Sequence, residues 1–259
     1  HGQEEAYPYP PQGGSPVGAA PRPIYMPPRP EGTPGPGVPP PAYAQRPAYY
    51  TPGMQSYGQP ELPRPMAEKD LIRVQDAFAS AALRAWEAGY DGVEIHAAHG
   101  YLLNQFYSPL TNKRTDAYTG STLEGRTRYL REVIQAVRAA VPADFVVTLR
   151  LGGGDYMEGG SRPEELPQAV ELLQQEGLDG ISFSGGMCIF FRPGHPEPGY
   201  FAELSQAAKE TARIPVLLTG GIETGNQAEH FLATGQADLI GLGRAALKDP
   251  QVFRKILEE

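Results

Sequence analysis

The spacing of hydrophobic residues changes in a regular way after residue 65. Stretches in which apolar residues recur about every 3.6 positions alternate with short stretches in which they recur every second position. The first spacing is typical of a helix with one buried face, and the second of a strand with one buried face. Because each strand pattern is followed by a helix pattern, we expect consecutive parallel β/α units. The expected strands cover residues 91–96, 145–151, 180–184, 215–219 and 239–242.

The helical stretches carry sequence signals for their ends. The first helix is expected over residues 67–88, with Gly89 placed to terminate it. Ser121 and Ser161 each precede a glutamate by three positions, which is the arrangement of a capping box at a helix N-terminus. Thr224 is expected to cap a later helix in the same way. Helices with their own caps support the alternating pattern.

Alternation within the strands separates an apolar face from a polar one. Val93, Ile95, Val147 and Leu149 share the apolar face, which suits covering helices. Small and polar groups that converge on one interior, with functional side chains at the carboxyl ends of strands, are typical of a (β/α)8 TIM barrel. Five strands do not close a barrel of eight, so we expect a partial barrel. The opposite face carries Glu94, His96, Thr148, Arg150, Ser182, Ser184, Gly241 and Gly243.

The first 65 residues have a different composition from the rest. They contain 19 of the 28 prolines but only four residues of the types Leu, Ile, Val and Phe. Such a segment buries too little apolar surface to offset its ordering entropy, and proline disfavours helix and sheet. We therefore expect residues 1–65 to form a disordered, Pro-, Gly- and Tyr-rich segment or expanded loop, and residues 66–259 to form the folded domain.

Charge and cysteine content narrow the classes of partner. The formal charge is −8, the pI is near 5.2, and no basic stretch is present, so we expect binding of neither nucleic acid nor an anionic membrane surface. Cys188 is the single cysteine, which excludes an intrachain disulfide. A small-molecule partner and a cytoplasmic location are the expectations. The chain begins at His1 rather than at a methionine, so an upstream segment is a further expectation.

Three residues that follow the first expected strand are candidates for catalysis. His96 ends this strand, His99 lies in the following turn, and Tyr101 comes two residues later, so all three can face one cavity. Imidazoles can donate hydrogen bonds to a developing oxyanion, and a phenol can deliver a proton to carbon. Two alternatives stay open. The histidines could be ordinary loop residues, or they could bind a metal ion if Glu94 or Asp155 supplied a third ligand.

Later strands end in residues suited to an anionic cofactor. Gly220, Gly221 and Gly243 let backbone amides approach an anion closely, and Arg244 adds a cationic fork that suits phosphate oxygens. TIM barrels often bind phosphate at this place, although tight turns that need glycine would explain the same residues. Arg150 points to the interior by parity, where it could serve a cofactor or form an ion pair with the neighbouring strand.

The residues after the first strand also carry a longer pattern. This pattern resembles the signature of the old yellow enzyme (NADH:flavin oxidoreductase) family, including members similar to 2,4-dienoyl-CoA reductase. The similarity continues to the C-terminus over about 190 residues. The run comprises His96 through Leu103, Asn104-Gln105-Phe106, Ser108-Pro109-Leu110-Thr111-Asn112, Arg114-Thr115-Asp116, Tyr118, Gly120-Ser121 and Glu124-Gly125-Arg126.

The resemblance implies an FMN-dependent ene or enoate reductase. In this family NADH or NADPH reduces FMN, which passes hydride to the β-carbon of an activated alkene. His96 and His99 would bind the substrate's oxygen, and Tyr101 would donate the proton. Arg150 would lie beside the flavin's pyrimidine edge, and the glycines with Arg244 would bind its phosphate. No metal is implied.

The resemblance also implies that three β/α units are missing ahead of the helix at residue 67, so that the chain would hold strands 4 to 8. We expect the missing strands to be either truncated or supplied by another chain, and we expect the isolated polypeptide to fold poorly or to form a homo-oligomer. Some relatives continue into an iron–sulfur and second flavin domain where this chain stops.

Two other functions compete with a reductase. An aldolase or isomerase barrel would need a catalytic lysine on an inner strand face, and none stands there. A degenerate half-barrel could act as a scaffold, with proline–tyrosine steps such as Pro8-Tyr9-Pro10-Pro11 binding polyproline-recognition modules.

Overall fold

The computed structural model describes residues 64–258. The disorder expected for residues 1–65 falls almost entirely outside the described residues, and the domain division at residue 65 stays a prediction. Among the described residues, no helix combines the length and the apolar character needed to cross a bilayer.

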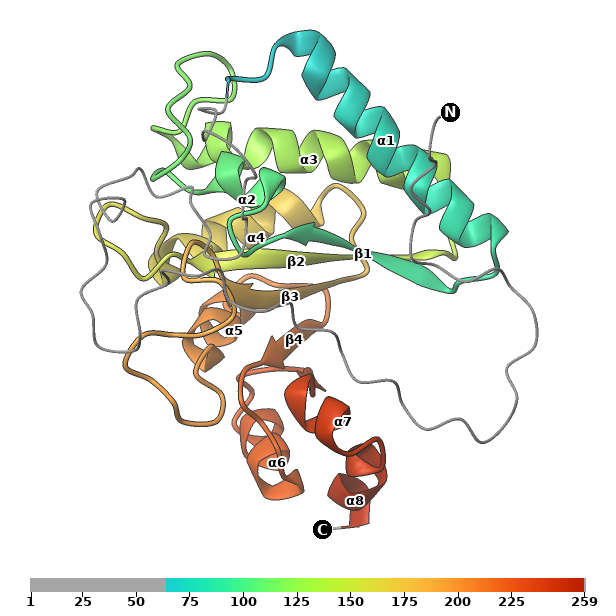
Figure 1. Ribbon diagram of the computed structural model, residues 1–259, viewed down its shortest axis with the longest axis vertical. Coiled ribbons are helices and arrows are strands. Elements are labelled where there is room, and N and C mark those ends of the chain that lie inside the picture. Colours follow the sequence, from blue (N-terminus) through green and yellow to red (C-terminus); the bar gives the residue numbers. More distant parts are fainter. Residues whose placement is uncertain (1–63, 259) are drawn as a thin grey trace, which may run out of the picture. The chain divides into compact units, whose positions relative to one another are not determined.

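The described residues form one parallel sheet of five strands (Figure 1). The strands follow one another in sequence order across the sheet, and every neighbouring pair is parallel. The expected β/α alternation is therefore confirmed. The sheet does not close on itself, so its first and last strands are edges within residues 64–258. The strands are β1 (Gly92–Ala97), β2 (Val146–Gly154), β3 (Gly180–Gly185), β4 (Val216–Thr219) and β5 (Leu239–Gly241).

Helices cover one face of this sheet. Figure 1 shows α1, α3 and α4 beside β1 and β2, and α5 continues this layer past β3 and β4. A short helix, α2, lies between β1 and α3 and was not expected from the sequence. The helices are α1 (Glu68–Glu87), α2 (Leu102–Tyr107), α3 (Leu123–Ala140), α4 (Leu166–Gln174), α5 (Ala202–Lys209), α6 (Gly225–Ala233), α7 (Arg244–Lys248) and α8 (Val252–Glu258), with a 3₁₀ turn, η2 (Pro163–Glu165), before α4.

The apolar core lies between the sheet and these helices. Ile95, Val147, Leu149 and Leu151 point into it and are almost fully buried. The alternate positions face the other side, where Glu94 is exposed. The predicted division of each strand into an apolar and a polar face is thus confirmed for β1 and β2, and it places polar side chains opposite the helix layer.

Two predicted helix caps are displaced by one residue. Thr122, not Ser121, caps α3, because its hydroxyl accepts a 3.1 Å hydrogen bond from the amide of Gly125. The Ser121 hydroxyl instead bonds to that of Thr119 at 2.9 Å. Ser161 does not cap a helix either, because Arg162 is the residue that precedes η2 and the Ser161 hydroxyl has no hydrogen-bond partner within residues 64–258. Thr224 caps α6 as predicted, with its hydroxyl accepting from the amide of Gln227.

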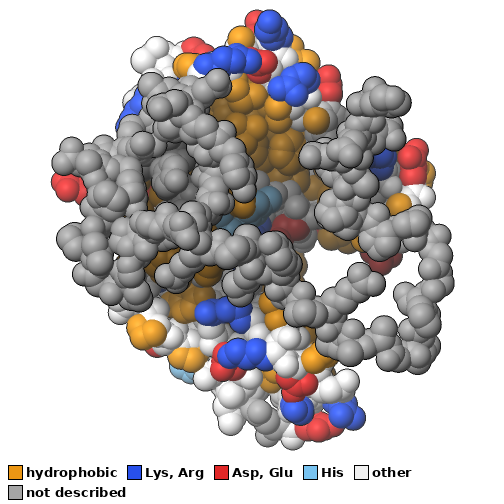
Figure 2. Space-filling model, in the orientation of Figure 1, with side chains coloured by type: hydrophobic (Ala, Val, Ile, Leu, Met, Phe, Trp, Pro, Cys, Tyr) orange, Lys and Arg blue, Asp and Glu red, His pale blue; other side chains and the backbone are white. Residues whose placement is uncertain are grey.

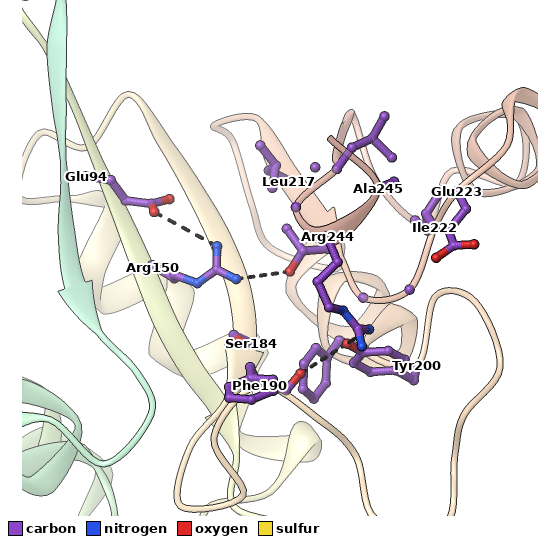
Figure 3. A pocket seen from close by; sticks show the side chains of 17 residues that line it. Glu94, Arg150, Ser184, Phe190, Tyr200, Leu217, Ile222, Glu223, Arg244 and Ala245 are labelled. Carbon is purple, nitrogen blue, oxygen red and sulfur yellow. Dashed lines mark hydrogen bonds and ion pairs between the residues drawn. The ribbon is translucent and has the colours of Figure 1, made fainter. Parts of the chain in front are cut away.

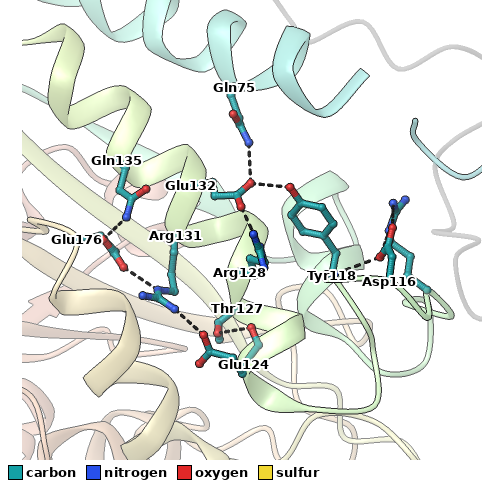
Figure 4. A network of polar contacts seen from close by, with 11 residues as sticks. Gln75, Asp116, Tyr118, Glu124, Thr127, Arg128, Arg131, Glu132, Gln135 and Glu176 are labelled. Atoms are coloured by element: carbon teal, nitrogen blue, oxygen red, sulfur yellow. Dashed lines mark hydrogen bonds and ion pairs between the residues drawn. The ribbon is translucent and has the colours of Figure 1, made fainter. Parts of the chain in front are cut away.

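The outer surface of the helix layer carries a network of charged and polar side chains (Figure 4). The carboxylate of Glu132 on α3 accepts hydrogen bonds of 2.9 Å from Gln75 on α1 and from the Tyr118 hydroxyl. Arg131 joins Glu124 on its own helix to Glu176 after α4. These partly buried contacts connect α1, α3 and the end of α4 to one another.

Candidate active site

The three predicted catalytic residues lie together at the carboxyl end of β1. The ring centroids of His96 and His99 are 5.0 Å apart, and those of His96 and Tyr101 are 5.2 Å apart. Figure 2 shows histidine surface deep in this face of the molecule, close to charged and apolar side chains. Tyr101 is 56% exposed. Within residues 64–258, neither the His96 ring nor the Tyr101 hydroxyl forms a hydrogen bond, so both remain available to a ligand.

The turn that carries His99 is held by its neighbours. His99 has a φ of 60°, a left-handed conformation that histidine tolerates better than most residues. Its backbone amide donates to the carbonyl of Gly185 at 3.1 Å, and its Nε2 lies 2.7 Å from the Ser184 hydroxyl. The next amide, of Gly100, donates to the side chain of Asn104 at 2.8 Å. The end of β3 and helix α2 therefore set the position of the imidazole.

Burial keeps both imidazoles uncharged at neutral pH. For His99, burial first, then repulsion from His96 when that ring is protonated, and then the charge of Arg150 lower the pKa from 6.5 to about 4. For His96, burial and then Arg150 lower the pKa, although Glu94 opposes this. A neutral imidazole has one donor and one acceptor nitrogen. Each ring can therefore offer one N–H to a ligand oxygen without a charge of its own.

Arg150 lies on β2 directly beside His96, with which it is paired in the sheet register. Figure 3 shows its guanidinium pointing into the cavity, with Glu94 on one side of it. One nitrogen donates to the Thr219 hydroxyl at 3.2 Å, and another lies 4.0 Å from the Glu94 carboxylate. Glu94 is fixed more closely by the Ser182 hydroxyl, which donates to it at 2.7 Å. The expected ion pair with Glu94 is present at the outer limit of such contacts, and it leaves Arg150 facing the interior.

A cavity of about 590 Å³ extends from these groups along the ends of β3, β4 and β5 (Figure 3). Arg150 and Glu94 line one part of it, and both predicted glycine turns and Arg244 line another. Ser184 and Phe190 also line the cavity. Ser184 is bonded to His99, and the Phe190 ring meets the His99 ring edge-on with centroids 6.4 Å apart. The candidate cofactor residues thus border a single space, and His99 contacts two of the residues that line it.

The glycine turns at the far end of the cavity differ in the space beside them, because a Cβ on Gly220 or Gly221 would lie 3.1 or 3.0 Å from the Tyr200 ring, whereas Gly243 is open. Gly220 and Gly221 have φ values of 132° and 70°, which side-chain-bearing residues rarely adopt. A Cβ placed on Gly243 would meet no atom within 4 Å. Arg244 donates to the Tyr200 hydroxyl at 3.2 Å, and no carboxylate in residues 64–258 pairs with it. An unpaired guanidinium beside glycine turns is suited to an anion.

Comparison with known proteins identifies the family to which the chain belongs. A family model described as the NADH:flavin oxidoreductase / NADH oxidase family matches residues 39–259. The chain belongs to this family. It is 40% identical over 199 residues to an NADPH dehydrogenase of Halalkalibacterium halodurans, covering 77% of this chain and 58% of that protein. It is 38% identical over 200 residues to a metal reductase of Desulforamulus reducens, covering 76% of this chain and 30% of that protein.

Solved structures of the same kind agree. A 2-naphthoyl-CoA reductase in complex with 2-naphthoyl-CoA superposes with a TM-score of 0.68 and 29% identity, over 75% of this chain and 30% of that one. Histamine dehydrogenase from Rhizobium sp. 4-9 gives a TM-score of 0.69 and 28% identity, over 77% of this chain and 29% of that one. This member of the flavin oxidoreductase family thus spans between about a third and three fifths of the relatives that it matches.

The cofactor of this family, FMN, carries a phosphate and a ring with a polar edge, and the residues present fit both groups. The unpaired Arg244 beside open glycine backbone suits the phosphate. Arg150 suits the ring edge, because its charge is only loosely compensated by Glu94. Within residues 64–258, no group of three or more His, Cys, Asp or Glu side chains could hold a metal ion.

Two residues support the site in roles that the sequence did not reveal. Asp155 is fully buried after β2, and Ser184 is almost fully buried at the end of β3. Their partners in the site, Ser108 and His99, are 47 and 85 residues away along the chain, so no local pattern could reveal the contacts. The carboxylate of Asp155 accepts hydrogen bonds from Ser108, Ser161 and Met187, and these donors meet only because three separate loops come together.

The loop after β3 contributes shape rather than further chemistry. Burial raises the pKa of the Cys188 thiol to about 12, which keeps it protonated and unreactive. His195 is bonded to Glu197 at 2.7 Å on the exposed part of the loop. Phe190 and Phe191 are about half exposed, and their rings contact each other near His99. Neither Cys188 nor His195 lines the cavity.

Proposed function

We propose that this chain forms the catalytic part of an FMN-dependent oxidoreductase that uses NADH or NADPH to reduce an activated C=C bond. The observation that carries the proposal is the meeting of His96, His99 and Tyr101 at the end of β1, beside Arg150 on β2. Membership of the NADH:flavin oxidoreductase / NADH oxidase family supports it. The substrate is a small molecule with an oxygen-bearing, electron-withdrawing group conjugated to the alkene.

His96 and His99 bind the oxygen of this group. Because both rings are neutral, each donates one N–H to the oxygen and draws electron density away from the β-carbon. Tyr101 supplies the proton to the adjacent carbon, since this residue is 56% exposed and its hydroxyl forms no hydrogen bond within residues 64–258. FMN supplies the hydride when bound.

Arg150, Gly220, Gly221, Gly243 and Arg244 hold the cofactor. Arg150 lies where it can stabilise negative charge on the ring, and its bond to Thr219 fixes the guanidinium. The glycine turns and Arg244 bind the phosphate at the opposite part of the cavity. Because Arg150 and the phosphate-binding residues line different parts of the cavity, an elongated ligand can bind in only one orientation.

We also propose that the five strands are strands 4 to 8 of an eight-stranded barrel. The strictly sequential parallel order and the polar face opposite the helices both support this. The edges of β1 and β5 that have no partner in residues 64–258 would then pair with the other three strands.

An absorbance titration of the purified chain with FMN tests the cofactor site, because bound flavin shifts its visible band. A phenol is then added to the flavin-loaded protein, since a phenolate oxygen resembles the oxygen that the histidines would bind. His96→Ala with His99→Ala should abolish the spectral change on addition of phenol and leave FMN affinity nearly unchanged. His230→Ala, on the exposed surface of α6, is the matched control. Unchanged phenol affinity in the double variant would refute the roles of the two histidines.

A further inference from the structure

His96 and His99 differ in how the protein holds them. No hydrogen bond is formed by the His96 ring within residues 64–258, whereas Nε2 of His99 lies 2.7 Å from Oγ of Ser184. Ser184 is 1% exposed, and this is its only side-chain hydrogen bond within the described residues. His99 lies in the loop after β1, and Ser184 lies near the end of β3, with β2 between these two strands in the sheet. The contact therefore connects two parts of the site.

The direction of this hydrogen bond follows from the burial of Ser184. If Nε2–H of His99 donated to Oγ, the hydroxyl proton of Ser184 would be left in a buried place without an acceptor. Buried donors without a partner are rare because they lose their hydration and gain nothing in return. If the hydroxyl instead donates to Nε2, both groups are satisfied. Nε2 must then be the unprotonated nitrogen of the ring.

We propose that Ser184 is a positioning residue that holds His99 as the neutral imidazole protonated on Nδ1, so that His99 can donate to a ligand only from Nδ1. A histidine's protonated nitrogen is set by the hydrogen bond that the other nitrogen makes. The free imidazole side chain would otherwise be able to carry the proton on either nitrogen. Ser184 removes this choice before any ligand arrives.

Other contacts agree with a neutral, fixed ring. In a doubly protonated ring Nε2 would be a donor, and the hydroxyl proton of Ser184 would then have no acceptor. Burial and the charges of His96 and Arg150 lower the pKa of His99 to about 4, which disfavours that form. The backbone of His99 is held by the carbonyl of Gly185, the residue after Ser184, so backbone and side chain are fixed by the same strand end.

If the proposed function holds, the contact with Ser184 makes His99 and His96 different donors to the substrate oxygen. His99 offers a single donor of fixed identity, from the nitrogen nearest its own backbone. His96 keeps both nitrogens open and can adapt to the ligand. Ser184 therefore determines where the second of the two donors to the substrate oxygen lies, without contacting that oxygen itself.

Nitrogen NMR of the ¹⁵N-histidine-labelled, flavin-free chain tests the proposal directly, because protonated and unprotonated ring nitrogens have well-separated shifts. We expect the His99 signals of the wild type to show Nδ1 protonated and Nε2 unprotonated. Ser184→Ala should convert His99 to the Nε2-protonated form or to a mixture, and Ser184→Thr, which keeps the hydroxyl, should restore the wild-type pattern. Ser182→Ala is the matched control, since that hydroxyl lies on the same strand but bonds to Glu94.

The outcome separates this role from the proposed function. A wild-type His99 protonated on Nε2, or an unchanged pattern in Ser184→Ala with the fold intact by circular dichroism, would overturn the role of Ser184. Phenol titration of the flavin-loaded variants is the second measurement, and we expect about a 10-fold weaker affinity in Ser184→Ala and full recovery in Ser184→Thr. If the nitrogen pattern changes as expected but no form of the protein binds phenol, the proposed function fails and the positioning role stands.

Discussion

The Ser108 hydroxyl donates a 2.6 Å hydrogen bond to the carboxylate of Asp155, and this contact ties the segment after β1 to the segment after β2. The same carboxylate accepts from the amide of Ser161 at 2.8 Å and from the amide of Met187 after β3 at 2.9 Å. Three loops that border the candidate site are thus joined through one fully buried side chain.

Asp155→Asn should therefore destabilise the fold. An amide nitrogen in place of either carboxylate oxygen would face a donor, either the amide of Met187 or the donors of Ser108 and Ser161. We expect a loss of about 1–3 kcal/mol in the free energy of unfolding, measured with urea. Asp144→Asn, an exposed position, should change it by less than about 0.5 kcal/mol. Equal stability of the two variants would show that the three loops do not depend on this carboxylate.

The lowered pKa of His99 predicts a dependence of stability on pH. Its pKa in the fold is about 4, against 6.5 for the free side chain, so the unfolded chain binds the proton more readily. Stability should thus fall as the pH drops from about 6.5 to about 4, and the contribution should be constant below that. Asparagine also tolerates the left-handed backbone, so His99→Asn is a suitable variant. Between pH 6.5 and pH 4, its free energy of unfolding should fall by about 1 kcal/mol less than that of the wild type, after allowance for solvent screening.

Urea unfolding across this pH interval is the measurement, and His230→Asn on exposed α6 should follow the wild type. Because burial also lowers the pKa of His96, the His99 variant should retain part of the dependence. A pH profile of His99→Asn identical to that of the wild type would contradict the shift.

Arg244→Ala should weaken FMN binding by about 10- to 100-fold, because a charge-assisted bond to phosphate is lost. Binding of riboflavin, which has the same ring but no phosphate, should not change. Arg254→Ala on α8 is the matched control, since that arginine is exposed and lies outside the cavity. Absorbance titration gives all of these affinities. An equal loss of riboflavin and FMN binding would place Arg244 at the ring instead of the phosphate.

Tyr101→Phe should slow reduction of the alkene by about 100- to 10,000-fold, the range in which a positioned proton donor contributes. Phenol binding and the free energy of unfolding should stay close to those of the wild type, because the hydroxyl forms no hydrogen bond within residues 64–258 and the ring is 56% exposed. Stopped-flow reoxidation of the reduced flavin by an enone measures the rate. A rate equal to that of the wild type would assign the proton to another group.

Sequence patterns predicted the strands well, because burial on one face of a strand imposes a period of two that can be read locally. They also predicted that His96 and Arg150 share an interior, and these residues are partners in the sheet register. The first residue of each helix was predicted less accurately. Ser121 and Thr122 are both good caps, and only the path of the preceding turn decides which hydroxyl reaches the amide of Gly125.

Contacts between distant residues could not be predicted in this way. Ser184 was expected to face the interior by parity, but its bond to His99 depends on the left-handed turn at His99. Asp155 was considered only as a metal ligand, whereas the fold surrounds it with hydrogen-bond donors. Such contacts form only when separate loops pack together, and the sequence of one loop does not determine which other loop it contacts.

The sequential order of the strands gives the sheet a gradient of local stability. β3 is buried along its whole length, whereas β5 has three residues, none of them buried, and among residues 64–258 it pairs with β4 alone. Opening should therefore cost least at β5 and most at the centre, and the amides of β2 and β3 should exchange hydrogen most slowly. The turns proposed to hold phosphate follow β4 and β5, so an anion bound there would contact both turns and stabilise the least stable edge of the sheet. Loading with the cofactor would then slow hydrogen exchange first where the free protein opens most readily.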